Sequence, residues 1–363
     1  MAKHNAENTR IKREYFDYLK EAMRRDEASI DAVAKALARF ETANNHKSFK
    51  SFHREQAKAF KRKLDAETNV RTGKPLARAT VHSTLSALKA FFIWLVGQPG
   101  YKSKVAYGDA DYFNLSEKDV RIAKASREKP VPTLEQVHHV LGNMPAETDI
   151  EKRNRALIAF AILTGARDGA LASFKLKHVN LAEGVVFQDA RDVNTKASKS
   201  FSTWFFPVGG NALSIFTEWC QHLRDNLLWG DNDPLFPKTL MGLGASGGFQ
   251  AVGLSRECWS NAGPIRTTFK DAFTAAGLPY FNPHSFRNTL VQHGMAVCKS
   301  AQAIKAWSQN LGHEKILTTF CNYGTLPAAQ QAELIRQTGQ PVELDPLSDP
   351  DIRALIERIQ KKA

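Results

Sequence analysis

The chain has 363 residues, of which 43% are hydrophobic, so it holds enough apolar material for more than one core and is not a disordered protein. Its net charge of +13 is concentrated in residues 1–130, where 27 basic residues stand against 16 acidic ones. Residues 131–330 hold 18 basic and 15 acidic residues, and residues 331–363 hold 5 and 6. Such a field attracts a polyanion to the first third, so we expect nucleic-acid binding there.

The cysteines and the apolar runs exclude several other classes of protein. The four cysteines have no CxxC spacing, so we expect neither a zinc site nor a disulfide framework. The first residues contain no apolar signal segment, and the longest apolar runs fall short of the roughly 20 residues that cross a bilayer. We therefore expect an intracellular, cytoplasmic protein without a membrane partner.

Residues 1–125 have the pattern of a helical domain. Apolar residues recur at helical spacing in 28–43, in 51–67 and in 79–96, and the last of these runs stops at Gly97. Basic residues form one stripe on the second of these helices and an acid-free run in the loop and turn that follow it. Phosphate contact explains both features better than solvation alone. The predicted DNA-binding residues are Arg54, Lys58, Lys61, Arg71, Lys74 and Arg78.

A charged, proline-containing segment at 126–132 predicts a linker, after which Thr133-x-x-Gln136 has the pattern of a capping box that starts a new helix. A helix closed by Gly165 follows, and two strand-like runs at 184–190 and 200–208 predict a hairpin. Further helices are expected at about 211–229, 264–276, 285–297 and 300–311, and an amphipathic tail helix at 350–361.

Several charged or polar residues stand where core packing does not require them. Arg167 follows a helix end in "TGARDGAL", and "HSFR" places His284 and Arg287 three residues apart at the start of a helix. His313 closes "LGH", and Tyr323 is the only tyrosine that comes after it. Each residue alone is explained by a cap, a turn or a surface ion pair. Their joint order is the stronger signal, with two lysines, Lys196 and Lys199, in the predicted hairpin loop.

This ordered set resembles the tyrosine recombinases, also called the phage integrase family. The resemblance covers about 131–330 and, more loosely, the helical first domain. It implies a mainly α fold with a small β-sheet, in which a helical SAM-like core-binding domain precedes an α/β catalytic domain. The implied boundaries are 1–125 for the DNA clamp, 126–132 for the linker and 133–330 for the catalytic domain, followed by a tail at 331–363. The apolar face of the tail helix would either dock on a neighbouring protomer or pack back on its own domain.

The resemblance also implies a role for each residue. Tyr323 would attack a DNA phosphate and form a covalent 3′-phosphotyrosyl bond, while Arg167 and Arg287 bind the non-bridging oxygens. His284 would accept a proton and His313 would donate a hydrogen bond. The leaving 5′ oxygen would take its proton from Lys196, chosen from the family's Thr-Lys-x-Gly-Lys turn, or from Lys199, whose spacing to Pro207 suits a shorter hairpin. No metal, cofactor or ATP is then required.

The implied activity is site-specific DNA recombination for a mobile genetic element, by a nucleoid-associated homotetramer on two DNA sites, with room for an accessory directionality protein. Two alternatives stay open, a type IB topoisomerase and an inactive DNA-binding accessory protein. The sequence departs from the family pattern at three places. Ala170 stands where an acid is usual, Asn288 where histidine is common, and the spacing from His313 to Tyr323 is one residue longer than expected.

Overall fold

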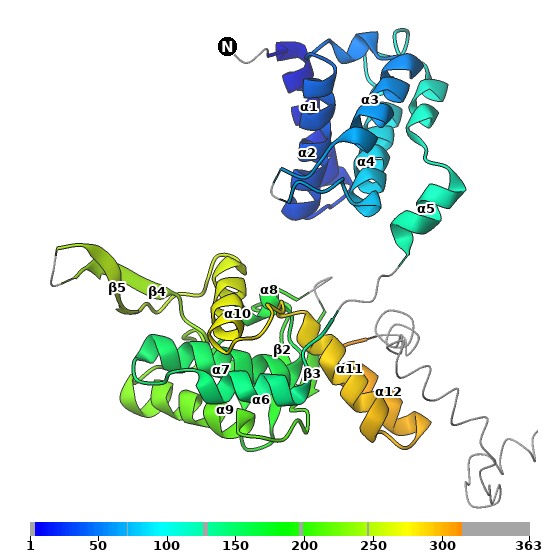
Figure 1. The fold of residues 1–363 in the computed structure, drawn as a ribbon. Coiled ribbons are helices and arrows are strands. Elements are labelled where there is room, and N and C mark those ends of the chain that lie inside the picture. The colour runs from blue at the N-terminus through cyan, green and yellow to red at the C-terminus, as the bar shows by residue number, and fades with distance from the viewer. Residues whose placement is uncertain (1–3, 71, 126–129, 196–198, 245–246, 314–363) are drawn as a thin grey trace, which may run out of the picture. The chain divides into compact units, whose positions relative to one another are not determined.

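The computed structural model describes residues 4–70, 72–125, 130–195, 199–244 and 247–313. The chain divides into two compact units, Met1–Arg127 and Glu128–Ala363 (Figure 1). Both are mainly helical, and the described strands all belong to the second unit, in one sheet of three strands and one of two. The predicted mainly α architecture with a small β component is therefore confirmed. The tail helix predicted at 350–361 lies outside the described residues, as do residues 126–129 of the predicted linker.

Helices make up the first unit, and they begin where the sequence provides caps. The side chains of Asn5, Asp26 and Ser116 each accept a backbone N–H of the helix that follows. The three helices expected from apolar spacing are present, whereas Arg78, expected in a loop, is the first residue of a helix. The elements are α1 Ala6–Asp17, η1 Tyr18–Ala22, α2 Glu27–Ala43, η2 Phe49–Ser51, α3 Arg54–Ala66, α4 Arg78–Val96, η3 Tyr107–Phe113 and α5 Glu117–Lys124.

Aromatic rings fill the core of this unit. The ring of Phe40 meets those of Phe60 and Phe113 edge to face and stacks on that of Phe49. Phe52 stacks on Phe92 with ring centroids 3.7 Å apart. Among the described helices, α4 alone has the length and apolarity that a membrane span would need. Many of its apolar side chains are buried in this aromatic core, which accounts for its composition.

The second unit is built around one central helix. Its elements are α6 Leu134–Asn143, α7 Asp149–Thr164, α8 Asp168–Leu171, η4 Leu176–His178, β1 Val179–Asn180, β2 Val185–Gln188, β3 Phe201–Trp204, α9 Ala212–Gln221, η6 His222–Asn226, β4 Thr239–Leu243, β5 Phe249–Leu254, α10 Gly263–Ala275, α11 Ser285–Val297 and α12 Ala301–Asn310. Residues 156–164 of α7 are all buried, and α6, α9 and α11 pack against this helix (Figure 1). The predicted capping box Thr133/Gln136 is present at the start of α6.

The three-stranded sheet carries the predicted hairpin and ties it to the end of α12. Strands β1, β2 and β3 pair antiparallel in that order, with Val186 opposite Thr203. At the outer edge, Trp204 N donates to Asn310 Oδ1 at 2.8 Å, and Asn310 Nδ2 donates to Trp204 O at 2.8 Å. Thr203 Oγ1 also donates to Asn310 O at 3.0 Å. These bonds fix the segment immediately before His313 against β3.

A second hairpin, β4–β5, was not expected from the sequence. It extends away from the helices of its unit (Figure 1), and residues 239–255 contain no charged side chain. Leu243 and Phe249 pair across the strands and are 77% and 73% exposed. The base of the hairpin is anchored by the buried side chain of Arg153, which donates to Pro237 O at 2.8 Å and Thr239 Oγ1 at 3.0 Å.

Candidate active site

The turn after α7 shapes the first part of the site. Gly165 ends the helix with φ +59°, a left-handed conformation that glycine adopts without steric cost. A Cβ at this position would lie 2.9 Å from Leu311 Cδ2 and 3.0 Å from Leu290 Cδ1, so the close packing also requires glycine. The reversal places Arg167, whose side chain is half-buried, at the N-cap of α8.

Arg287 joins three segments that are distant in sequence. Its side chain is only 1% exposed, and its guanidinium donates to three acceptors. Nη1 donates to Gly165 O at 2.6 Å, and Nη2 donates to Leu311 O at 2.5 Å and to His313 Nε2 at 3.0 Å. A fixed planar fork of this kind suits arginine and not lysine. One buried positive charge therefore holds three segments together, namely the turn before Arg167, the first turn of α11 and the "LGH" segment.

His313 is neutral in this environment. Burial, together with the positive charges of Arg287 and Arg167 and the neighbouring His284, lowers the pKa of its imidazole to about 4. Because a guanidinium can only donate, the Nε2 that meets Arg287 accepts, and the ring hydrogen is carried by Nδ1.

The structure brings together four of the predicted catalytic residues. His284 is the exposed N-cap residue of α11, and its effect on the pKa of His313 places it in the same neighbourhood as Arg167 and Arg287. Lys199 is half-buried at the end of the loop that joins β2 to β3. Lys196 and Tyr323 lie outside the described residues. The assignment of roles within this cluster stays a prediction.

An ion pair beside the cluster was not found by reading the sequence. Arg266 on α10 donates from Nε and Nη2 to Asp168 Oδ2 at 2.8 and 2.6 Å, and Asp168 is the residue after Arg167. An acidic residue directly after Arg167 was the available signal, but nothing in the sequence indicates its partner 98 positions later.

The predicted DNA-binding residues of the first unit are exposed or half-exposed where they are described, and most have local partners. Lys58 Nζ lies 2.8 Å from Glu55 and over the ring of Tyr112, and Lys61 Nζ donates to Asn114 O at 2.9 Å. Exposed ion pairs contribute only about 0–1 kcal/mol, so a phosphate can replace such partners. Arg54 and Arg78 are held in the same way by Glu55 and Asp65, Lys74 is exposed, and Arg71 lies outside the described residues.

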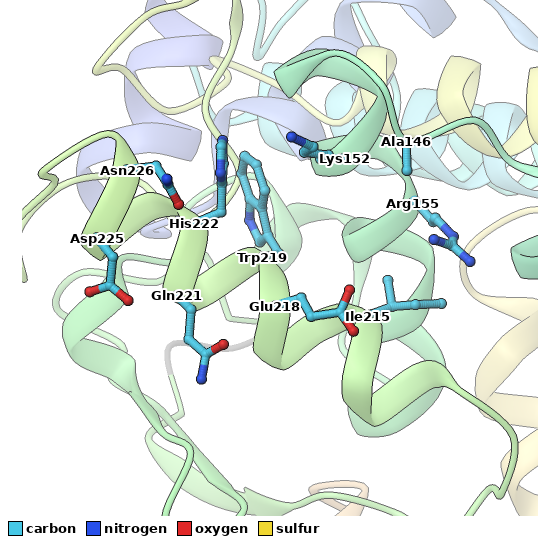
Figure 2. Close-up of a pocket in the computed structure, with 10 residues that line it drawn as sticks. All are labelled: Ala146, Lys152, Arg155, Ile215, Glu218, Trp219, Gln221, His222, Asp225 and Asn226. Carbon is cyan, nitrogen blue, oxygen red and sulfur yellow. The ribbon is translucent and has the colours of Figure 1, made fainter.

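A separate pocket of about 400 Å³ lies between α7 and α9 and contains none of the predicted catalytic residues (Figure 2). Lys152 and Arg155 line it from α7, and Glu218 and Trp219 line it from α9. His222 lies 2.8 Å from Asp149 Oδ1. Because the lining contains side chains of both signs of charge, it does not indicate one class of ligand.

Comparison with known proteins decides the family. The sequence profile described as "Phage integrase family" matches residues 131–328, which is more than half of the chain. The chain belongs to the phage integrase family. A similar curated relative is the tyrosine recombinase XerC of Escherichia coli O157:H7, which is 27% identical over 248 residues that span 68% of this chain and 70% of XerC. The predicted family is confirmed, and the chain is a tyrosine site-specific recombinase.

Solved structures share the fold of this chain. A lambda integrase fragment, crystallised as a dimer bound to a COC′ core site, matches with a TM-score of 0.58 and 13% identity, over 87% of this recombinase and 95% of that chain. XerH, in a post-cleavage complex with a palindromic difH substrate, matches with a TM-score of 0.57 and 18% identity, over 90% and 84% of the two chains. At these identities the likeness concerns the fold alone.

Proposed function

We propose that this recombinase cuts and rejoins double-stranded DNA at specific sites through a covalent 3′-phosphotyrosyl intermediate. The buried Arg287 is the observation that carries the proposal, because one guanidinium collects Gly165, Leu311 and His313 around it. Arg167 and His284 act on the same imidazole. Two arginines and two histidines converging in this way form a site that can hold a phosphodiester and neutralise the charge of its transition state.

Each step can be assigned to a side chain of this chain. The hydroxyl oxygen of Tyr323 attacks the phosphorus and loses its proton to His284, while Arg167, Arg287 and His313 stabilise the non-bridging oxygens. The P–O5′ bond breaks, and the 5′ oxygen takes a proton from Lys196 or Lys199. Attack by a 5′ hydroxyl on the phosphotyrosyl bond reverses these steps. Because one phosphoester replaces another, no ATP is needed, and because Arg167 and Arg287 supply the positive charge at the phosphate, no metal ion is needed.

The proposal extends to the assembly. The basic residues of 1–125 bind the duplex as a clamp, and 133–330 carries out the chemistry. Four protomers pair two duplexes, with the tail 331–363 as a contact between neighbours and an accessory protein setting direction. The lambda integrase and XerH complexes, which contain DNA sites, support the duplex as the partner. Action on chromosomal or mobile DNA makes the protein nucleoid-associated.

A covalent-trapping assay tests the chemistry. The chain is incubated with duplexes that contain its native flanking DNA, and adducts that survive denaturing electrophoresis are measured. We expect adduct in excess EDTA with the native chain, and none with Tyr323→Phe, which keeps the ring and removes only the nucleophilic oxygen. Tyr107→Phe, at an exposed tyrosine of the first unit, is the matched control and should form adduct normally.

Adduct formation by Tyr323→Phe would overturn the assignment of the nucleophile, and loss of adduct on chelation, restored by magnesium, would overturn the metal-free chemistry. Relaxation of supercoiled plasmids that lack any flanking site, at the rate of plasmids that carry one, would favour the topoisomerase alternative.

A further inference from the structure

Arginines from two other helices bind the residues on both sides of Arg167. Two residues before it, Gly165 O accepts from Arg287 Nη1 at 2.6 Å. One residue after it, Asp168 Oδ2 accepts from Arg266 Nε at 2.8 Å and from Nη2 at 2.6 Å. The first contact comes from α11 and the second from α10, so the turn that presents Arg167 is fixed between two helices.

The short helix after Arg167 needs such external support. α8 spans only Asp168–Leu171, and one isolated helical turn does not hold its own conformation. Asp168 uses both carboxylate oxygens here, because Oδ1 accepts from Gly169 N at 3.0 Å while Oδ2 receives Arg266. The carboxylate therefore caps its own turn and ties that turn to α10. Ala170, which stands where the family pattern has an acid, is buried, and its methyl group has no atom that could accept a hydrogen bond.

We propose that Asp168 and Arg266 form a positioning pair that orients Arg167 toward the scissile phosphate. The inference rests on the proposed function, since it assigns a task to Arg167. A shift of about 1 Å in a reacting or charge-stabilising group can slow a reaction by about 10²-fold. Release of the Asp168 anchor removes the tie between this turn and α10, so the orientation of the Arg167 guanidinium is no longer fixed. The fold survives, because Gly165 O keeps its bond to Arg287 and Ala166, Ala170 and Leu171 stay buried.

The exposure of the Asp168–Arg266 pair separates a positioning role from a purely structural one. The side chains of Asp168 and Arg266 are 27% and 59% exposed, and solvent screens a pair of this kind so that it adds little to stability. Loss of the pair is therefore expected to change the cleavage rate and to leave the unfolding midpoint of the second unit in place. The rival interpretation is that Arg266 is itself a DNA phosphate contact and that Asp168 is only its counter-ion.

A double-mutant cycle in the full chain distinguishes these interpretations. The variants are Asp168→Asn, Arg266→Ala and the double variant, and each is measured for the rate of adduct formation at saturating enzyme and for DNA affinity. Arg224→Ala is the matched control, because Arg224 forms a similarly exposed pair with Asp231 at 2.9 Å outside the cluster. We expect each single variant to slow cleavage by about 10- to 100-fold, with DNA affinity unchanged within about twofold. The double variant should be no slower than the worse single variant, and the control should cleave normally.

A neutral substrate adds a readout that only the positioning role predicts. A methylphosphonate at the scissile position removes the non-bridging charge that Arg167 would neutralise. The deficits of the pair variants should then shrink to within about threefold of the native chain, because Arg167 no longer contributes. Any one of three results would overturn the inference. These are native cleavage rates in both single variants, additive losses of rate in the double variant, and an undiminished deficit on the methylphosphonate substrate. Weak DNA binding by Arg266→Ala with a harmless Asp168→Asn would identify a phosphate contact instead. Failure of the proposed function is seen separately, as adduct formation by Tyr323→Phe.

Discussion

Replacing Arg287 by lysine tests whether the buried fork organises the site. Lysine keeps the positive charge but offers one nitrogen, which cannot meet Gly165 O, Leu311 O and His313 Nε2 in the geometry that the guanidinium satisfies. We expect two of the three hydrogen bonds to be lost in a position that is 1% exposed. A buried hydrogen bond to a charged group contributes about 1.5 kcal/mol, so the second unit should lose about 3 kcal/mol of unfolding free energy.

Urea denaturation measures this loss directly. Five of the six tryptophans lie in the second unit, so tryptophan fluorescence mainly reports its unfolding. With an m-value of about 2–3 kcal/mol/M, a loss of about 3 kcal/mol lowers the midpoint by about 1–1.5 M urea. The rate of adduct formation should fall by at least about 10²-fold, because the proposed mechanism also assigns Arg287 to a non-bridging oxygen of the phosphate. Arg256→Lys, at an exposed arginine that pairs with Asp233, is the control and should keep both values.

If Arg287→Lys unfolded at the native midpoint and formed adduct at the native rate, the guanidinium would organise nothing that lysine cannot. A lowered midpoint with a native rate would also contradict the prediction, because the same fork is argued to serve both the fold and the phosphate.

Three further predictions follow from the same contacts. Since burial and nearby positive charges lower the pKa of His313 to about 4, against about 6.5 in the unfolded chain, protonation favours unfolding. Stability should be complete above about pH 6.5 and fall by up to about 3 kcal/mol toward pH 4, and urea midpoints of His313→Asn should vary less with pH. Gly165→Ala forces a side chain into the left-handed region against Leu311, so its midpoint should fall by an amount equivalent to at least about 1–2 kcal/mol. Lys58→Ala with Lys61→Ala should weaken DNA binding equally across sequences and reduce the slope of log affinity against log salt by about 2, as measured by titration at several salt concentrations.

Local patterns made much of the fold predictable. The apolar spacing that indicated α2, α3 and α4 is also the spacing of their buried faces, because one stripe of each helix fills the aromatic core. The β2–β3 hairpin was predicted because two apolar runs flank a polar segment. The hairpin β4–β5 was missed because glycines interrupt its alternation and its apolar side chains face solvent on both strands. Arg78 was predicted in the loop but is the first residue of α4. The start of this helix was hard to predict because its cap residue, Ala77, makes no side-chain hydrogen bond.

The site was predictable only as an ordered set of residue types. The sequence indicated which side chains gather, but the backbone acceptors Gly165 O and Leu311 O that hold Arg287 are invisible to residue identity. The partner of Asp168 was equally hidden, because the packing of α10 beside α8 depends on the whole core of the unit. Long-range pairing of this kind is set by tertiary structure, and no local pattern specifies it.

The exposed apolar hairpin β4–β5 and the net positive charge of the recombinase depend on salt in different ways. At low ionic strength, the net charge of +13 keeps separate copies apart and brings DNA close. At about 0.1 M salt and above, screening confines this repulsion to about 10 Å, while the uncharged strands with exposed Leu243 and Phe249 keep their attraction for other apolar surfaces. We therefore expect the concentration at which copies begin to associate to fall over the same salt range in which DNA is released. Association between copies and release of DNA would then be coupled through the ionic strength of the surroundings.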